Sequence, residues 1–244
     1  MLNLKLALQD VARRAGYIVK RSNYYSNETL RLVRYLEVNK IDTVLDVGGN
    51  KGDYALSLIE GGFTGKIYSF EALPTMHDRL VGLAKKYQDQ WQIAPRCAIS
   101  DGAGTAEFYV TKAISSSSLL QPNKIANGVG ELFDVVEKLE VRTESLTAAC
   151  EALGLTSGRM FLKLDIQGGE ERALLGAQPL FPRITGIVAE MPLRIYYEGQ
   201  AHMKALDDWI TARDYLMWDI QSVWRDPDTG RLDHVDVTYF RAEQ

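Results

Sequence analysis

The amino-acid sequence predicts an α/β protein with a mostly parallel sheet, helices on both faces and an antiparallel hairpin at the C-terminal end. From Ile41 onward, short runs rich in β-branched residues alternate with stretches of helical spacing. This alternation is typical of a parallel sheet covered on both faces. The first strand ends in a glycine-rich turn at residues 46–52. The last two strands are separated by DPDTG at residues 226–230, a dense turn sequence that favours a hairpin.

Each element follows from its local pattern. Apolar runs predict strands over residues 43–47, 66–70, 92–98, 160–165 and 185–190. Apolar residues at helical spacing predict helices over residues 52–60, 75–87, 145–153, 169–177 and 202–213. The hairpin strands are expected over residues 215–221 and 235–241, and further strand material over 105–110 and 139–143. Between the latter two lies a serine- and asparagine-rich stretch, residues 115–128, which we expect to be a loop of low order.

The composition excludes several classes of protein. The chain has 244 residues, 46% of them apolar, and a net charge of −4, which argues against a dedicated nucleic-acid binder. No apolar run approaches the roughly 18–20 residues of a membrane span, and the first residues lack the pattern of a secretory signal. Cys97 and Cys150 are far apart, which is typical of reduced thiols in a cytoplasmic protein.

The first 40 residues differ from the rest in charge, with eight Lys/Arg against three Asp/Glu. Helical spacing is visible over residues 2–20 and again over 28–38. We therefore expect an N-terminal helical extension at 1–40 and the main domain at 41–244. The extension is expected either to cover the domain or to rest on an anionic membrane or partner.

The turn after the first strand, VLDVGGNKG, is typical of a ligand-binding loop at the carboxyl end of a parallel strand. Its glycine spacing differs from the G-x-G-x-x-G of dinucleotide-binding folds, and no G-K-[ST] of a P-loop follows. An acid followed by Gly-x-x-x-Gly suits a small zwitterion, such as the amino-acid end of S-adenosyl-L-methionine. We therefore expect Asp46, Gly48, Asn50 and Gly52 to hold that end, with backbone N–H groups facing its carboxylate.

The next two strands supply candidates for the adenosine end. Glu71 stands at the tip of the second strand, 25 residues after Asp46. A carboxylate at this position can accept both ribose hydroxyls and would repel a 2′-phosphate. After the third strand, Asp101 can accept from an adenine amino group, with the backbone of Ile99 and Ser100 bordering the ring. Asp101 is also a common residue type for a plain turn.

With these motifs, the sequence resembles the FkbM family of S-adenosyl-L-methionine-dependent methyltransferases. The resemblance rests on VLDVGGNKG, YSFEALP, AISDGAGTAEFYV, SSSSL, VRTESL, FLKLDIQGGEERALLGA, VAEMPLRIYYEGQ and VDVTYFR, in family order. Gly49 stands where the family usually has alanine, and Gln167 where many members have glutamate. The resemblance implies the class I methyltransferase fold, a Rossmann-like, seven-stranded sheet ending in an antiparallel hairpin. It also implies O-methylation of hydroxyls on sugars or secondary metabolites.

Methyl transfer to a hydroxyl is an in-line displacement in which the acceptor loses a proton, so we expect a base near the reacting atoms. Asp165 ends the fourth strand and is expected to contact both cofactor and acceptor. Glu170 starts the next helix, Glu190 ends the fifth strand, and His202 follows a segment expected to cover the pocket. Asp165, Glu170 and His202 are the catalytic candidates. Such carboxylates can also bind Mg²⁺, although we expect no metal.

Two other functions fit parts of the sequence. An NAD-linked oxidoreductase would use Glu71 in the same way, but the glycine spacing disfavours it. A non-catalytic module would bind S-adenosyl-L-methionine and dock through the basic N-terminal helices, including on a membrane surface. For the enzyme we expect a small-molecule or glycan acceptor and no nucleic acid. Loops over 111–135 and 192–204 are expected to shape the acceptor site.

Overall fold

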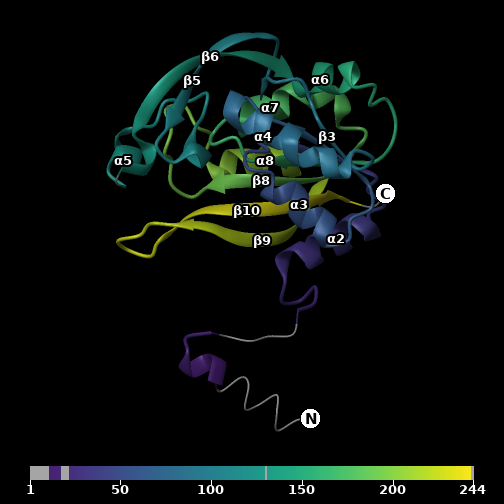
Figure 1. Cartoon of the computed structure of the whole chain (residues 1–244), viewed down its shortest axis with the longest axis horizontal. Helices are drawn as coiled ribbons and strands as arrows, with labels where there is room; N and C mark the ends of the chain where they lie inside the picture. Colours follow the sequence, from purple (N-terminus) through teal and green to yellow (C-terminus); the bar gives the residue numbers. More distant parts are fainter. Residues whose placement is uncertain (1–10, 18–21, 130, 243–244) are drawn as a thin grey trace.

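Seven strands form a central sheet, and three more form a small second sheet (Figure 1). The computed structural model describes residues 11–17, 22–129 and 131–242. In spatial order the central sheet consists of β3 (Trp91–Ile93), β2 (Lys66–Phe70), β1 (Thr43–Val47), β7 (Met160–Leu164), β8 (Ile184–Pro192), β10 (Leu232–Arg241) and β9 (Tyr215–Arg225). The first five strands pair in parallel, whereas β10 runs antiparallel to both neighbours. The predicted class I methyltransferase fold is therefore confirmed.

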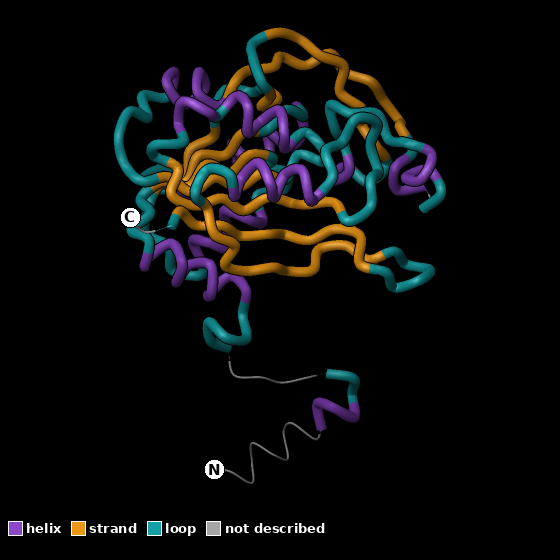
Figure 2. Tube along the Cα trace, turned by 180° about the vertical axis from the view of Figure 1, so that it is seen from behind, coloured by secondary structure: helices purple, strands orange, loops and turns teal. Residues whose placement is uncertain are grey.

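Helices cover both faces of the central sheet, as its buried parallel strands require. One face carries α2 (Glu28–Val38), α3 (Asp53–Glu60) and α4 (Pro74–Ala84), and the other carries α6 (Leu146–Ala152), α7 (Glu170–Gly176) and α8 (Met203–Thr211). Short helices and 3₁₀ turns complete the fold: η1 (Lys85–Tyr87), η2 (Ile114–Ser116), α5 (Lys124–Asn127), η3 (Glu131–Phe133) and η4 (Gln178–Leu180). All five residues of β1 are buried, so this strand lies between two apolar cores. Figure 2 shows the layers from the opposite side.

The helices predicted from residue 28 onward are confirmed, and their first residues show why they begin where they do. Asn27 Oδ1 accepts from Leu30 N at 2.9 Å at the start of α2. Ser145 Oγ accepts from Ala148 N at 3.1 Å at the start of α6. Such caps satisfy N–H groups that have no partner within the helix. Pro74 opens α4, where its missing N–H leaves no hydrogen bond unmade.

The single strand predicted over 92–98 is wrong, because this stretch contributes to two sheets. β3 lies at the edge of the central sheet, whereas β4 (Ala98–Ser100) pairs with β6 (Val135–Ser145) in the second one. Pro95 lies between them and has no N–H for a ladder, so pairing with β2 stops there. β5 (Gly104–Thr111) and β6 account for the additional strand material, and they arch over one end of the molecule (Figure 1).

The helix predicted over residues 2–20 lies mostly outside the described residues, whereas the one over 28–38 is α2. Arg31 Nε in α2 donates to Asp219 Oδ2 in β9 at 2.6 Å, which fastens this helix to the edge of the sheet. The division at residue 40 stays a prediction. Within the described part of the chain, no helix has the length and apolar character needed to cross a membrane.

The serine-rich stretch is held by hydrogen bonds, in contrast to the loop of low order that we expected. Ser117 and Ser118 are buried. Ser117 Oγ accepts from Thr111 N at 3.1 Å, and Ser118 Oγ donates to Gln167 O at 2.7 Å. Serine hydroxyls can bond nearby backbone groups in place of a strand ladder. The stretch therefore has a defined position beside the turn that follows β7.

The close contact between α7 and β4 makes Gly176 a sensitive position. A Cβ on Gly176 would lie 2.1 Å from Ser100 O, whereas one on Gly82 in α4 would meet nothing within 4 Å. We expect Gly176→Ala to lower the free energy of unfolding by about 1–3 kcal/mol, as overpacking does. Gly82→Ala should raise it by about 0.5–1 kcal/mol through helix propensity. Urea unfolding of both variants checks this, and equal effects would contradict the described packing.

Candidate functional site

A cavity opens at the carboxyl ends of β1, β2 and β7, beside β4 of the second sheet. The predicted residues that line it are Gly48, Asn50, Glu71, Ile99 and Asp165. This edge is where open α/β sheets bind their ligands. We refer to it as the cofactor cavity.

The glycine turn is shaped by its contact with the turn after β7. Gly48 has a φ of 84°, and a Cβ on it would lie 1.9 Å from Asp165 O, so only glycine fits. Gly48 N and Gly49 N both donate to Phe70 O at 3.0 Å, and Gly52 N donates to Gly49 O at 2.8 Å. These N–H groups are used within the protein. The expectation that they face a ligand carboxylate is therefore wrong, and Gly52 shapes the turn without lining the cofactor cavity.

Asp46 is fully buried and does not line the cofactor cavity, so its expected role in holding the methionine end stays a prediction. Ser69 Oγ donates to Asp46 Oδ2 at 2.7 Å, and Lys163 Nζ lies 3.1 Å from Oδ1. Lys163 also donates to Gly48 O at 2.7 Å and lies 3.7 Å from Asp165 Oδ2. Burial opposes the charge on Lys163, but the carboxylates of Asp46 and Asp165 outweigh it and raise the pKa of Lys163. The sequence reasoning missed Lys163, although a lone lysine inside an apolar strand is an unusual signal.

Glu71 lies where the sequence places it, at the tip of β2 and in the wall of the cofactor cavity. Its Oε2 accepts from Asn50 N and its Oε1 from Leu73 N, both at 2.8 Å. Burial raises the pKa of Glu71, and these backbone hydrogen bonds oppose the rise. Each carboxylate oxygen can accept a further hydrogen bond, so the group is oriented and still open to two ligand hydroxyls.

The end of the cofactor cavity near β4 is apolar. Ile99 lines it together with Met76, Ala98, Phe108 and Leu119. Ser100 is buried and Asp101 is exposed, and neither lines the cavity. Ser100 Oγ donates to Asp101 Oδ1 at 3.1 Å. The predicted contact of Asp101 with an adenine is therefore not supported by its position, and the flat apolar walls from β4 and β5 are the features that suit a purine.

A second cavity adjoins the first, and we refer to it as the acceptor cavity. Four residues line both cavities: Asn50, Ser115, Asp165 and Gln167. The other walls come from the predicted loop 111–135, from β8 and from the hairpin, and include Phe133, Glu190, Trp224 and His234. Asp165 therefore lies at the junction, where a group held in one cavity meets a group held in the other.

Carboxyl groups around the junction have different environments. Burial, followed by the charges of Asp165 and Glu170, raises the pKa of Glu190 well above its usual range. Burial and Asp165 raise the pKa of Asp236 to about 7. Asp165 is half-exposed, and its Oδ2 lies 3.7 Å from Lys163 Nζ. Carboxyl groups whose environments differ in this way take different roles, one as a proton acceptor and another as a neutral hydrogen-bonding group.

His234 on β10 is a site residue to which the sequence reasoning gave no role. Burial lowers its pKa to about 4, so its imidazole is neutral at physiological pH. Its Nδ1 lies 3.9 Å from Glu190 Oε1, and its Nε2 is buried with no protein partner. A neutral imidazole with an open nitrogen can hydrogen-bond an incoming hydroxyl. The residues next to His234 in the sequence do not indicate that its side chain lines a cavity.

Glu170 and His202, two of the three catalytic candidates, do not line either cavity, which corrects that prediction. Glu170 is buried and its Oε1 accepts from Ile166 N at 3.0 Å, so it closes the turn after β7. Burial raises the pKa of Glu170 to about 7. His202 is exposed at the start of α8. Among the described residues, no three His, Cys, Asp or Glu side chains gather as a metal ion would require.

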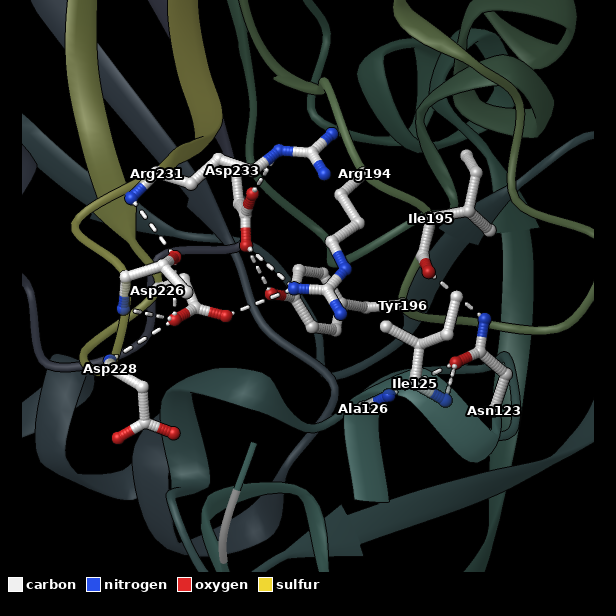
Figure 3. Close-up of polar contacts among 11 residues, drawn as sticks. Asn123, Ile125, Ala126, Arg194, Ile195, Tyr196, Asp226, Asp228, Arg231 and Asp233 are labelled. Carbon is white, nitrogen blue, oxygen red and sulfur yellow. Dashed lines mark hydrogen bonds and ion pairs between the residues drawn. The ribbon is translucent and has the colours of Figure 1, made fainter. Parts of the chain in front are cut away.

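Figure 3 shows charged and aromatic side chains of the loop after β8 and of the hairpin in polar contact with one another. Tyr196 OH donates to Asp233 Oδ2 at 2.5 Å, and Arg194 Nη1 donates to Asp226 Oδ2 at 3.0 Å. The Tyr196 ring stacks on Phe133, with centroids 5.1 Å apart. The loop after β8 therefore supports the acceptor cavity from behind and does not line it.

A sheet ending in an antiparallel hairpin, with a glycine turn after β1 and an acid at the tip of β2, defines a class I methyltransferase. Residues 46–217 match the Methyltransferase FkbM domain, and the chain belongs to this family. It is therefore an S-adenosyl-L-methionine-dependent methyltransferase.

Several solved structures have a similar fold, whereas no curated protein matches the chain. Sp1610 of Streptococcus pneumoniae, in complex with S-adenosyl-L-methionine, is 11% identical, with 89% of this chain and 74% of that chain covered and a TM-score of 0.49. Precorrin-6y C5,15-methyltransferase of Geobacter metallireducens is 10% identical, with 88% and 87% covered and a TM-score of 0.45.

The neutral state of His234 predicts a pH dependence of stability. Its pKa is about 4 in the folded protein and about 6.5 in an unfolded chain. The unfolded state therefore binds more protons between these values, and the stability linked to His234 is lost as pH falls from 6.5 to 4. We expect wild type to lose about 3 kcal/mol relative to His234→Gln over this range. Urea unfolding from pH 4 to 7 checks this, with His202→Gln as an exposed control that should leave the slope unchanged.

Proposed function

We propose that the protein transfers a methyl group from S-adenosyl-L-methionine to a hydroxyl oxygen of a sugar, a glycan or a secondary metabolite. The observation that carries the proposal is the position of Asp165, at the junction of two adjoining cavities. One cavity offers an oriented carboxylate and apolar walls, which suit a nucleoside. The other offers an acid, a neutral histidine and aromatic rings, which suit a hydroxylated ring.

The residues of the cofactor cavity fit the parts of S-adenosyl-L-methionine. Glu71 would accept from the ribose hydroxyls, and Ile99 with Phe108 would enclose the adenine. Asn50 Oδ1, which is buried and has no protein partner, would accept from the ammonium group of the methionine end. When bound, the cofactor supplies an electrophilic methyl group. Asp165 faces this end of the cavity with a negative charge, which favours a cationic sulfonium.

The acceptor cavity favours a hydroxyl that must be deprotonated. Asp165 would hold the hydroxyl and take its proton as the oxygen attacks, which is general-base catalysis. Trp224 and Phe133 offer aromatic faces to a ring. Among the described residues that line the acceptor cavity there is no lysine or arginine, so these residues offer no cation to a phosphate-bearing acceptor. A neutral polyol or phenol is the acceptor that this arrangement favours.

The cofactor assignment predicts a thermal shift. A ligand at 100 times its Kd stabilises by about 2.7 kcal/mol, which is roughly 5–11 °C for a chain of this size. We expect this shift with S-adenosyl-L-methionine and S-adenosylhomocysteine and none with NAD. Glu71→Gln should lose at least about tenfold in cofactor affinity, because one ribose hydrogen bond to a charged group is removed. Glu151→Gln is the exposed control. A shift with NAD alone would favour the oxidoreductase.

If Asp165 is the base, replacing it should lower the rate of methyl transfer and leave cofactor affinity nearly unchanged. Asp165→Asn should keep cofactor affinity within a few-fold and lower methyl transfer by about a hundredfold or more, since a positioned base contributes that much. The measurement is mass spectrometry of S-adenosylhomocysteine and methyl ether with a panel of glycosides, polyols and phenols. Asp78→Asn, whose side chain is 87% exposed, is the matched control. Cofactor binding without transfer to any acceptor in wild type would favour the non-catalytic module.

A further inference from the structure

Gln167 lies at the contact between the two cavities and has an unusual backbone. Its φ is 56°, in the left-handed region that favours glycine, and it is followed by Gly168 with a φ of 101°. Its carbonyl accepts from Ser118 Oγ at 2.7 Å, which joins this turn to the serine-rich stretch. Left-handed conformations of non-glycine residues cost free energy and persist where the surroundings hold them in place. The conformation directs the side chain toward the carboxyl groups of the junction.

The Gln167 amide bridges the two carboxyl groups of the acceptor cavity. Its Nε2 donates to Asp165 Oδ1 at 2.9 Å and to Glu190 Oε2 at 2.5 Å. Tyr197 OH lies 3.1 Å from Gln167 Oε1 and 2.8 Å from Ser116 O, and its one hydrogen can serve either acceptor. The reverse amide orientation would place an oxygen between two carboxyl oxygens, one of which would then have to carry a proton. The two hydrogens of the NH₂ group then serve one carboxyl group each.

A glutamate at position 167 could not make this bridge, because an ionised carboxylate has no hydrogen to donate. Two further acids lie near the bridge. The groups that face it from β7, α7, the loop after β8 and β10 are Lys163, Glu170, Tyr197, Asp236 and His234. Lys163 is the one cation among them, and it is already held by Asp46 and Gly48. An additional acid would therefore lack a compensating charge.

We propose that Gln167 is the positioning residue of this site: its amide holds Asp165 and Glu190 in place as a pair and keeps Asp165 turned toward the junction of the cavities. This inference rests on the proposed role of Asp165 as the base. Tyr197 OH lies beside the amide, and Ser118 Oγ donates to the Gln167 carbonyl and holds the backbone that carries the side chain. Gln167 stands where many family members have glutamate. Its amide, unlike a carboxylate, can donate to both Asp165 and Glu190 in this chain.

The test compares Gln167→Glu with Gln88→Glu, which adds the same charge at an exposed position. A carboxyl group at 167 would be forced to share a proton with its neighbours, so its folded pKa would lie above the unfolded value of about 4.3. The contribution of this carboxyl group to the free energy of unfolding is then lost as pH rises from the unfolded pKa to the folded pKa. We expect the melting temperature of Gln167→Glu to fall further below wild type between pH 5 and 8, while Gln88→Glu stays level with wild type.

Measurements of kcat distinguish a positioning role of Gln167 from a purely structural one. With an acceptor that wild type methylates, we expect Gln167→Glu and Gln167→Ala to lower kcat by about tenfold or more through misplacement of the base. Cofactor affinity should stay within about threefold. The acid limb of the kcat profile of Gln167→Glu should move upward by about one pH unit, because the added like charge favours protonation of Asp165.

Two results would overturn the inference. One is a melting profile of Gln167→Glu that matches Gln88→Glu across the pH range. The other is a kcat of Gln167→Ala within twofold of wild type with an unmoved acid limb for Gln167→Glu. If wild type transfers no methyl group, the proposed function fails, and the melting series alone decides whether Gln167 bridges the two acids.

Discussion

A buried positive charge determines the arrangement of this site. Lys163 lies in the middle of the sheet, where an uncompensated ammonium would be unstable, so its partners must be close. Asp46 lies directly opposite it on β1, and Gly48 O and Asp165 complete its surroundings. The glycine turn must therefore pass so near to β7 that a single Cβ on Gly48 would collide with Asp165 O. The turn, the strand register and the position of Asp165 all depend on this one charge.

The same charge allows several acids to share a small volume. Asp165 is the acid that faces both Lys163 and solvent, whereas Glu190 is enclosed. Their environments separate two carboxyl groups that have the same intrinsic chemistry, which is how one site obtains both a proton acceptor and a neutral hydrogen-bonding group. Gln167 joins the two by its amide. Hydrogen bonds connect Gln167 to Asp165, Glu190 and Tyr197, whereas His234 Nε2 is left without a protein partner and so remains open to a ligand.

The two cavities are built in different ways. The walls of the cofactor cavity come largely from the turns directly after β1, β2 and β7, so short sequence motifs encode them. The walls of the acceptor cavity come from segments far apart in the chain, with Phe133 before β6, Glu190 in β8 and Trp224 in the hairpin. The serine-rich stretch joins β5 and β6 of the second sheet (Figure 1). This sheet brings Phe133 close to Glu190 and Trp224. Loops on a fixed scaffold can vary in this way while the cofactor side stays the same.

The central sheet, most helices and the positions of Gly48 and Glu71 after β1 and β2 could be predicted from the sequence, because strand alternation, turn residues and the spacing of these residues are local properties of the chain. The tertiary structure alone decided which of these residues reach the cavity. In the folded protein, Asp46 lies beneath the glycine turn and pairs with Lys163, and Glu170 accepts a hydrogen bond from Ile166 N. His202 is exposed. The tertiary structure also brought His234 and Gln167 to Asp165. Burial and long-range contact decide these roles, and neither is encoded in the spacing of neighbouring residues.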